Sequence, residues 1–530
     1  MSEDHFVRVL VPLRLAWIPV YRSAETMERG QAVNVVLSGR RYTGIVWETD
    51  AVPDIDESRI RPISSVAAEV PGVRAAEMDF WNFLASYYMC SVGEVYKAAR
   101  PVFYARRARS SAAAVEKLKR RLSATEAELG KSHRSEAVVR RLEERRRMLC
   151  ARISESDDGG FVPGPFLPAG GGAMSRPLAV IGSDRLQAYS GAIRKALARN
   201  GQVLVLTPES PFSKRLETAL RPIFGEAVRR FGPDTSEAGK SRLAEDLRKG
   251  RSIVAVGTKT ALFLPFSRLA LVIIDEEQDP LFKQNDSAPR YNGRDAAIKL
   301  AELHSAEVML GSSCPSLETA YNCRTGKYAV SECPGRLGRA EVIDMAAEKR
   351  KNGISGHFSR RLVSMIRECG GPVTIIRGWE KSDEIASETE VLFPDMSLDV
   401  ITLNELKRDG CGTPAMIAVL QADALVSKDD FRSDERAMQI VTMLRSLSPE
   451  VKIQTSVPER FDGSKTEASL LDERKKFGFP PYTRLVDIKT EGSAETVERH
   501  FLKRDRTLAS CKARILAAIP PGCYPDVDPA

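Results

Sequence analysis

The sequence lacks the features of a membrane-spanning, secreted or zinc-ribbon protein. No apolar run approaches the ~20 residues that a membrane helix needs, and the first ten residues are too charged and interrupted for a secretory signal. The nine cysteines are scattered, without a CxxC pair. Zinc ribbons usually take two ligands from one tight knuckle, so we expect no zinc. Because the sequence also lacks a membrane helix and a secretory signal, we expect no membrane partner and a cytoplasmic location.

Most of the chain also lacks an excess of either charge. The net charge is +8, and residues 101–150 alone hold 14 Lys or Arg against 6 Asp or Glu, which accounts for the whole excess. A local basic excess beside a balanced body is typical of a protein that contacts phosphate backbones. The alternative interpretation is a solvated helix with no ligand.

Hydrophobic periodicity indicates several folding units. Short β-type runs within residues 6–47 predict a small antiparallel β domain, and residues 75–99 predict two helices. A Gly- and Pro-rich stretch at residues 157–172 predicts a linker. Beyond it, short apolar strands alternate with helical patterns in two successive passages, which predicts parallel sheets covered on both faces.

One strand of the first passage ends in carboxylates. The segment LALVIIDEE, residues 269–277, predicts a buried parallel strand with Asp275 and Glu276 at its carboxyl end, the edge where open α/β sheets bind ligands. In a nucleotide-hydrolysing site Asp275 would hold magnesium through water, and Glu276 would orient the attacking water. Acidic strand ends also occur without such a role, so a structural function remains the alternative.

Further motifs flank this strand. VGTKTALFLPF precedes it, and DPLFKQNDSAPRYNGRDAA and VMLGSSCPSLETA follow it. These segments resemble the PriA family of replication-restart helicases, which has a GTRSALFAPF-like segment, a DEEH box, an SYKQ…RYHARD loop and a GSATPSLE segment in the same order. VLVPLRLAWIPVY resembles the family's domain that captures a nascent 3′ end, and DERKKFGFPPYTRLVDI resembles the start of its carboxy-terminal domain. The resemblance covers nearly the whole chain.

This resemblance implies a multidomain α/β fold with a small N-terminal β-rich DNA-binding domain, two RecA-like parallel-sheet lobes and a short α+β C-terminal domain. The second lobe is expected to be degenerate. The expected units are a 3′-end DNA-binding domain (1–104), a basic helical arm (105–156), a linker (157–175), lobe 1 (176–345), lobe 2 without a zinc insertion (346–462) and a truncated C-terminal domain (463–530).

The resemblance also implies a DNA-binding set. Tyr21 falls where the family has a pocket tyrosine, and Lys283, Arg290, Tyr291 and Arg294 lie in the loop that links DNA contact to the nucleotide site. Interleaved rings and cations suit base stacking beside phosphates, although these residues could equally pack and pair internally. The implied partners are forked or single-stranded DNA, with single-strand-binding protein and primosome components as further candidates.

The nucleotide loop departs from the family's pattern. Where the family has GVTGSGKTE, this chain reads IGSDRLQAYS, without the glycine-rich turn or the lysine. A P-loop needs consecutive backbone N–H groups around the phosphates and a lysine on their oxygens. Gly182, Ser183 and Arg185 are the nucleotide-binding candidates that remain, and Asp184 would place a negative charge near the phosphates.

The second lobe departs as well. The arginine-finger segment is replaced by IVTMLRSLSP with the single arginine Arg445, and losing such a finger typically costs about 10³–10⁵ in rate. We therefore expect a motor that has lost ATP hydrolysis, with Asp275 and Glu276 as relics and with ATP and magnesium as cofactors of the family only. One alternative is an active ATP-dependent 3′ to 5′ DNA helicase with a divergent nucleotide site. Another is a decaying gene product that barely folds.

Overall fold

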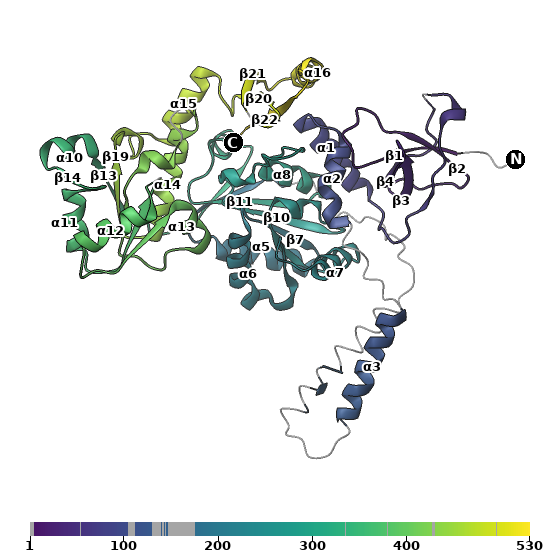
Figure 1. Cartoon of the computed structure of the whole chain (residues 1–530), viewed down its shortest axis with the longest axis horizontal. Helices are drawn as coiled ribbons and strands as arrows, with labels where there is room; N and C mark the ends of the chain where they lie inside the picture. Colours follow the sequence, from purple (N-terminus) through teal and green to yellow (C-terminus); the bar gives the residue numbers. More distant parts are fainter. Residues whose placement is uncertain are drawn as a thin grey trace.

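A computed structural model describes residues 5–53, 55–103, 112–129, 139, 142, 143, 145, 146, 175–333, 335–378, 380–426, 430–493 and 495–529. It has an N-terminal β domain at one end, two parallel-sheet lobes and a small antiparallel C-terminal sheet (Figure 1). The predicted multidomain α/β fold is confirmed, including two successive parallel sheets. Within the described ranges, no helix is both long and apolar enough to span a bilayer.

The N-terminal domain is an antiparallel five-stranded sheet in the order β2-β1-β4-β3-β5. Alternating valines of the first and third strands enter one core, because successive side chains of a strand point to opposite faces. The strands are β1 (His5–Leu10), β2 (Val20–Ser23), β3 (Ala32–Leu37), β4 (Arg40–Glu48) and β5 (Ser65–Val66).

Two helices, α1 (Ala75–Tyr88) and α2 (Val92–Phe103), join this domain to the first lobe. Trp81 of α1 stacks between Trp47 and Tyr96, with ring centroids 6.4 and 5.6 Å away. Arg74, which precedes α1, donates from Nη2 to the Arg248 carbonyl of the first lobe at 2.9 Å. Buried side chains of the two helices and of the first lobe also form one hydrophobic core.

The first lobe contains a seven-stranded parallel sheet in the order β12-β6-β11-β10-β7-β9-β8. Side chains of its central strand enter separate cores on the two faces, as expected for a strand covered on both sides. The strands are β6 (Leu178–Gly182), β7 (Gln202–Leu206), β8 (Val228–Phe231), β9 (Val254–Gly257), β10 (Leu269–Asp275), β11 (Glu307–Ser312) and β12 (Ala329–Cys333). The helices are α5 (Leu186–Ala198), α6 (Ser210–Phe224), α7 (Glu237–Arg248), α8 (Gly293–His304) and α9 (Leu317–Arg324).

The second lobe has a five-stranded parallel sheet, β13-β19-β18-β16-β17, with a hydrophobic core on each face. Its strands are β13 (Arg339–Asp344), β16 (Val373–Arg377), β17 (Leu398–Thr402), β18 (Met416–Val419) and β19 (Glu450–Thr455). The helices are α10 (Met345–Lys351), α11 (Arg360–Glu368), α12 (Ser382–Leu392), α13 (Leu403–Asp409) and α14 (Ser433–Leu447), and a ribbon of β14 (Ile354–Ser355) and β15 (Phe358–Ser359) adjoins them.

The second sheet takes one strand from before residue 346, the predicted start of lobe 2. β13 pairs in parallel with β19, so this sheet includes residues 339–344. The pairing joins segments more than a hundred residues apart, and the domain bounds stay a prediction.

The C-terminal part consists of α15 (Glu467–Phe477), a sheet in the order β21-β20-β22 and α16 (Leu508–Ala518). The strands are β20 (Thr483–Thr490), β21 (Thr496–Lys503) and β22 (Cys523–Val527). Val486, Ile488 and Val527 pack into the core around α1. Of the predicted basic arm, α3 (Ala112–Leu129) and five single residues are described; the rest of the arm, and all of the predicted linker except residue 175, lie outside the described residues.

A buried histidine predicts an acid-sensitive fold. Burial, together with the charge of Arg74, lowers the pKa of His304 from 6.5 to about 4. His304 is therefore neutral in the folded chain but takes up a proton on unfolding below pH 6.5, so its contribution to stability is lost as the pH falls from 6.5 toward 4. We expect a loss of about 3 kcal/mol across this window, measured by urea denaturation. The variant His304→Asn should flatten the profile by about this amount, and an unchanged profile would contradict the assignment.

Candidate nucleotide site and lobe junction

The connection between β6 and α5 is too short to wrap a phosphate group. Only Ser183, Asp184 and Arg185 lie between the end of the strand and the first residue of the helix, whereas a P-loop spans roughly eight residues. The connection also packs closely against β12, because a Cβ added to Gly182 would lie 1.6 Å from the carbonyl oxygen of Cys333. The loop therefore offers no ring of consecutive N–H groups.

Arg185 occupies the space in front of the acidic end of β10. Its Nε and Nη2 atoms lie 3.1 and 2.9 Å from Oδ1 of Asp275, and Nη2 also contacts Oε1 of Glu276. Its Nη1 donates to the carbonyl oxygen of Gly182 at 2.6 Å. With a side chain only 9% exposed, Arg185 forms a buried ion pair with both carboxylates.

Two neighbouring side chains also bind these carboxylates, Tyr189 at the oxygen that Arg185 contacts and Gln278 at the second oxygen of Glu276. The Tyr189 hydroxyl donates to Oδ1 of Asp275 at 2.7 Å, and the Gln278 amide donates to Oε2 of Glu276 at 2.7 Å. Tyr189 can approach because β11 has glycine at Gly311, where an added Cβ would lie 1.6 Å from the tyrosine hydroxyl. The acidic pair is therefore bound by its own chain.

The electrostatics keep Arg185 charged beside the two carboxylates. Burial lowers the pKa of Arg185, but Asp275 and Glu276 outweigh burial and raise it above its ordinary value. Burial raises the pKa of Glu276, and Arg185 opposes that rise. Magnesium at this edge would need oxygens that Arg185 and Tyr189 now hold, so the residues in this arrangement do not fit a magnesium-nucleotide complex. No group of three or more potential ligands among the described residues is placed to hold a metal ion.

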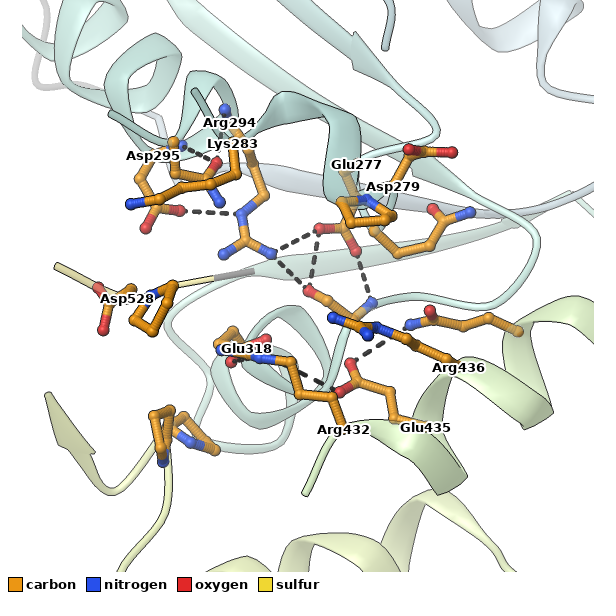
Figure 2. A pocket seen from close by; sticks show the side chains of 18 of the residues that line it. Glu277, Asp279, Lys283, Arg294, Asp295, Glu318, Arg432, Glu435, Arg436 and Asp528 are labelled. Carbon is orange, nitrogen blue, oxygen red and sulfur yellow. Dashed lines mark hydrogen bonds and ion pairs between the residues drawn. The ribbon is translucent and has the colours of Figure 1, made fainter. Parts of the chain in front are cut away.

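A second polar site lies where the two lobes meet the C-terminal part (Figure 2). Glu277 is the third carboxylate of the run Asp275–Glu277 that begins at the end of β10. It accepts from Nη1 of Arg294 at 3.1 Å and from the Ser316 backbone N–H at 2.8 Å. The cavity has a volume of about 80 Å³. Ligand pockets usually enclose about 300–1,000 Å³, so this cavity is too small for a nucleotide.

Buried ion pairs cross this junction. Arg432, which precedes α14, lies 3.0 Å from Glu318 of α9, and Glu435 accepts from the Leu317 backbone N–H at 2.8 Å. Burial alone would raise the pKa of Glu318, but Arg432, Arg294 and Arg474 outweigh it and lower that pKa. A further ion pair, between Lys407 and Asp279, joins the lobes at 2.9 Å. These contacts join the two lobes directly.

The structure brings four of the five predicted DNA-binding residues together in one loop region. Lys283 is buried, 2.7 Å from Asp526, and Tyr291 is buried with its hydroxyl 3.1 Å from the Lys259 carbonyl oxygen. Arg294 lines the junction, as described above. Arg290 is half-buried and lies with its guanidinium carbon 3.4 Å from the ring centroid of Tyr524.

The fifth predicted residue, Tyr21, lies apart from the loop in the N-terminal β domain. It is buried, and its hydroxyl donates to the Val36 carbonyl at 3.3 Å. All five residues thus have structural partners, and their part in DNA binding stays a prediction.

Sequence reasoning missed several members of these sites. Tyr189 was not expected beside the acidic pair, and Glu318 and Glu435 were not expected at the lobe junction. The segments CPSLETA and FRSDERAMQ carry the two junction residues. The common signal was that each segment places a carboxylate at the start of a helix.

A known protein family matches the N-terminal part of the chain. Residues 8–101 match the family described as the PriA 3′DNA-binding domain (3′BD). This range covers the N-terminal β sheet and most of the two helices that pack on the first lobe.

Whole-chain comparisons extend the similarity. The chain is 27% identical over 370 residues to the replication restart protein PriA of Rickettsia prowazekii (strain Madrid E), covering 68% of this chain and 51% of that protein. It is 32% identical over 194 residues to the PriA of Chlamydia pneumoniae, covering 36% of this chain and 26% of that protein. The match thus spans about half of the Rickettsia relative. Among solved structures, RecG bound to a three-way DNA junction is 14% identical, with a TM-score of 0.36 over 62% of this chain and 46% of that chain, a likeness too low to support an argument.

Proposed function

Because the chain belongs to the PriA family of replication restart proteins, we propose that it binds forked or single-stranded DNA during replication restart without hydrolysing ATP. The observation that carries the second half of this proposal is the buried contact of Arg185 with Asp275 and Glu276. Single-strand-binding protein and primosome components are its proposed protein partners, and the cytoplasm is its proposed location.

The loss of hydrolysis is supported by an energetic argument. A nucleotide-bound magnesium would first have to displace Arg185 from Asp275 and Glu276, and the buried guanidinium would then be left without its carboxylate partners. A buried charge without a partner costs free energy, and this cost weakens nucleotide binding. The short loop before α5 would not recover it, because it lacks the lysine and the N–H groups that normally hold the phosphates.

DNA binding is supported by two separate features. The match to the 3′DNA-binding domain covers residues 8–101, and the basic excess lies directly after it, in residues 101–150. Proteins that neutralise phosphates release counterions, so their affinity falls with salt. The arrangement supports structure-dependent DNA binding with little sequence preference.

ATP hydrolysis and DNA binding by the purified chain test the two halves together. With a fork that carries a free 3′ end, we expect binding whose affinity falls at least about tenfold between 50 and 200 mM salt, and no stimulation of phosphate release. Turnover stimulated by the fork and abolished in Glu276→Gln would instead establish the active-helicase alternative. An absence of both signals, with a broad unfolding transition, would favour the decayed protein.

A further inference from the structure

Four phenylalanines meet where the second lobe adjoins the C-terminal sheet, and we name them the phenylalanine patch: Phe431, Phe477, Phe479 and Phe501. The rings of Phe431 and Phe479 stack with centroids 4.6 Å apart and planes 6° from parallel. Phe479 also lies 5.6 Å from Phe501 and 6.4 Å from Phe477. Phe431 precedes α14, Phe477 ends α15, Phe479 follows α15 and Phe501 lies in β21. Figure 1 shows α15 beside the C-terminal sheet.

Two of these rings face solvent. Phe477 is 60% exposed and Phe501 is 45% exposed, although burying a phenylalanine typically stabilises a fold by about 1.5–3 kcal/mol. Phe501 shares its face of β21 with Arg499, because side chains two positions apart on a strand point to the same face; Leu485 and Asp487 of β20 lie opposite them. The patch is therefore a rigidly supported aromatic surface with two accessible rings.

Exposed lysines lie on the elements that carry the exposed rings. Lys475 and Lys476 are exposed in the last turn of α15, and Lys503 is exposed at the end of β21. The Nζ atom of Lys476 lies 5.5 Å from the centroid of Phe477. The acidic group beneath the patch, Asp487, is buried and paired with Arg499 at 2.8 Å. The surface therefore presents two apolar rings, one of them in contact with the ammonium group of Lys476.

We propose that the phenylalanine patch stacks the bases of single-stranded DNA, while Lys475, Lys476 and Lys503 pair with its phosphates. This inference rests on the proposed DNA-binding function and adds a contact outside residues 8–101. Every base has a π-face that can stack on an aromatic ring, and the neighbouring phosphates need cations nearby. A duplex keeps its bases stacked on one another and offers no such faces, so the patch selects single strands. Phenylalanine has no polar group to distinguish bases, so little sequence preference follows.

The test compares Phe477→Ala/Phe501→Ala with the wild-type chain in fluorescence anisotropy titrations, using labelled oligo(dT) and a blunt duplex of equal length. We expect the double variant to bind oligo(dT) about 10- to 100-fold more weakly, because each stacked base contributes about a tenfold factor or more. Duplex affinity should change less than about twofold. Val391→Ala is the control, because Val391 is 79% exposed on α12 of the second lobe, and it should leave both affinities unchanged.

The double variant Phe477→Leu/Phe501→Leu provides a second test in case the alanine variant does not fold, since leucine keeps an apolar side chain but removes the ring. It should lose oligo(dT) affinity to a similar degree. Equal oligo(dT) affinity in folded variants and wild type would overturn the patch while leaving the proposed function intact. Wild-type chain that binds neither fork nor oligo(dT) would overturn the proposed function and this inference together. A wild-type dimer that the variants convert to monomers, at unchanged oligo(dT) affinity, would identify an interface between two copies and also overturn the inference.

Discussion

Replacing Arg185 by alanine is expected to lower the free energy of unfolding by about 3–5 kcal/mol. The substitution leaves Asp275 and Glu276 facing each other without the cation that now lies 2.9 Å from Asp275, and an uncompensated buried charge has a cost of this size. Urea denaturation followed by tryptophan fluorescence measures it, because Trp81 lies in the core that the N-terminal helices share with the first lobe.

The destabilisation by Arg185→Ala should depend on pH in a defined direction. Burial already raises the pKa of Glu276, and Arg185 is the group that opposes the rise, so its removal raises that pKa further. A carboxyl group whose pKa is higher in the folded than in the unfolded chain costs stability as the pH rises from about 4.5 through the folded-state value. The variant should therefore lose less stability at pH 5 than at pH 8.

Adding Glu276→Gln to Arg185→Ala provides the matched control. It removes one of the two negative charges but keeps a side chain of similar shape, so at least half of the lost stability should return at pH 8. A pH-independent loss, or no recovery in the double variant, would show that Arg185 acts through packing and not through the acidic pair.

The second large effect is expected at Lys283, where methionine should cost about 3 kcal/mol of unfolding free energy. Lys283 is buried 2.7 Å from Asp526 of β22 and donates to the Val527 carbonyl at 2.6 Å, and a buried pair that loses one partner is destabilised by an amount of this order. Burial lowers the pKa of Lys283, and Asp526 opposes that change. Removing the ammonium group should therefore loosen β22 from the first lobe.

Denaturation together with limited trypsin digestion of the C-terminal sheet measures this effect. Lys283→Met should speed cleavage within residues 483–529, whereas Arg290→Ala should cost less than about 1 kcal/mol, because its guanidinium is half-buried on the Tyr524 ring. The double variant Lys283→Met/Asp526→Leu should recover part of the loss. If Lys283→Met lowers DNA affinity while stability and cleavage stay at wild-type values, Lys283 contacts DNA and its structural assignment is wrong.

Much of the fold could be predicted from the sequence, but less of the candidate site. Apolar runs predicted β10 and its neighbours correctly, because buried parallel strands are continuous hydrophobic segments whose signal is local. The missing glycine-rich turn between β6 and α5 was also visible in the sequence. The sequence could not show that Arg185 turns back onto Asp275, 90 residues away, because that contact depends on the lateral order β6-β11-β10 within the sheet.

What the sequence by itself determined, therefore, is which elements form, the family motifs they carry and the absence of a phosphate-wrapping loop. Tertiary structure alone decided which charges meet. It buried Lys283 beneath a strand that begins 240 residues later, joined Glu318 to Arg432 across the two lobes, and gathered Phe431, Phe479 and Phe501 into one patch. The physical reason is that secondary structure follows local patterns, whereas ion pairs and aromatic clusters form between segments that chain folding brings together from distant positions.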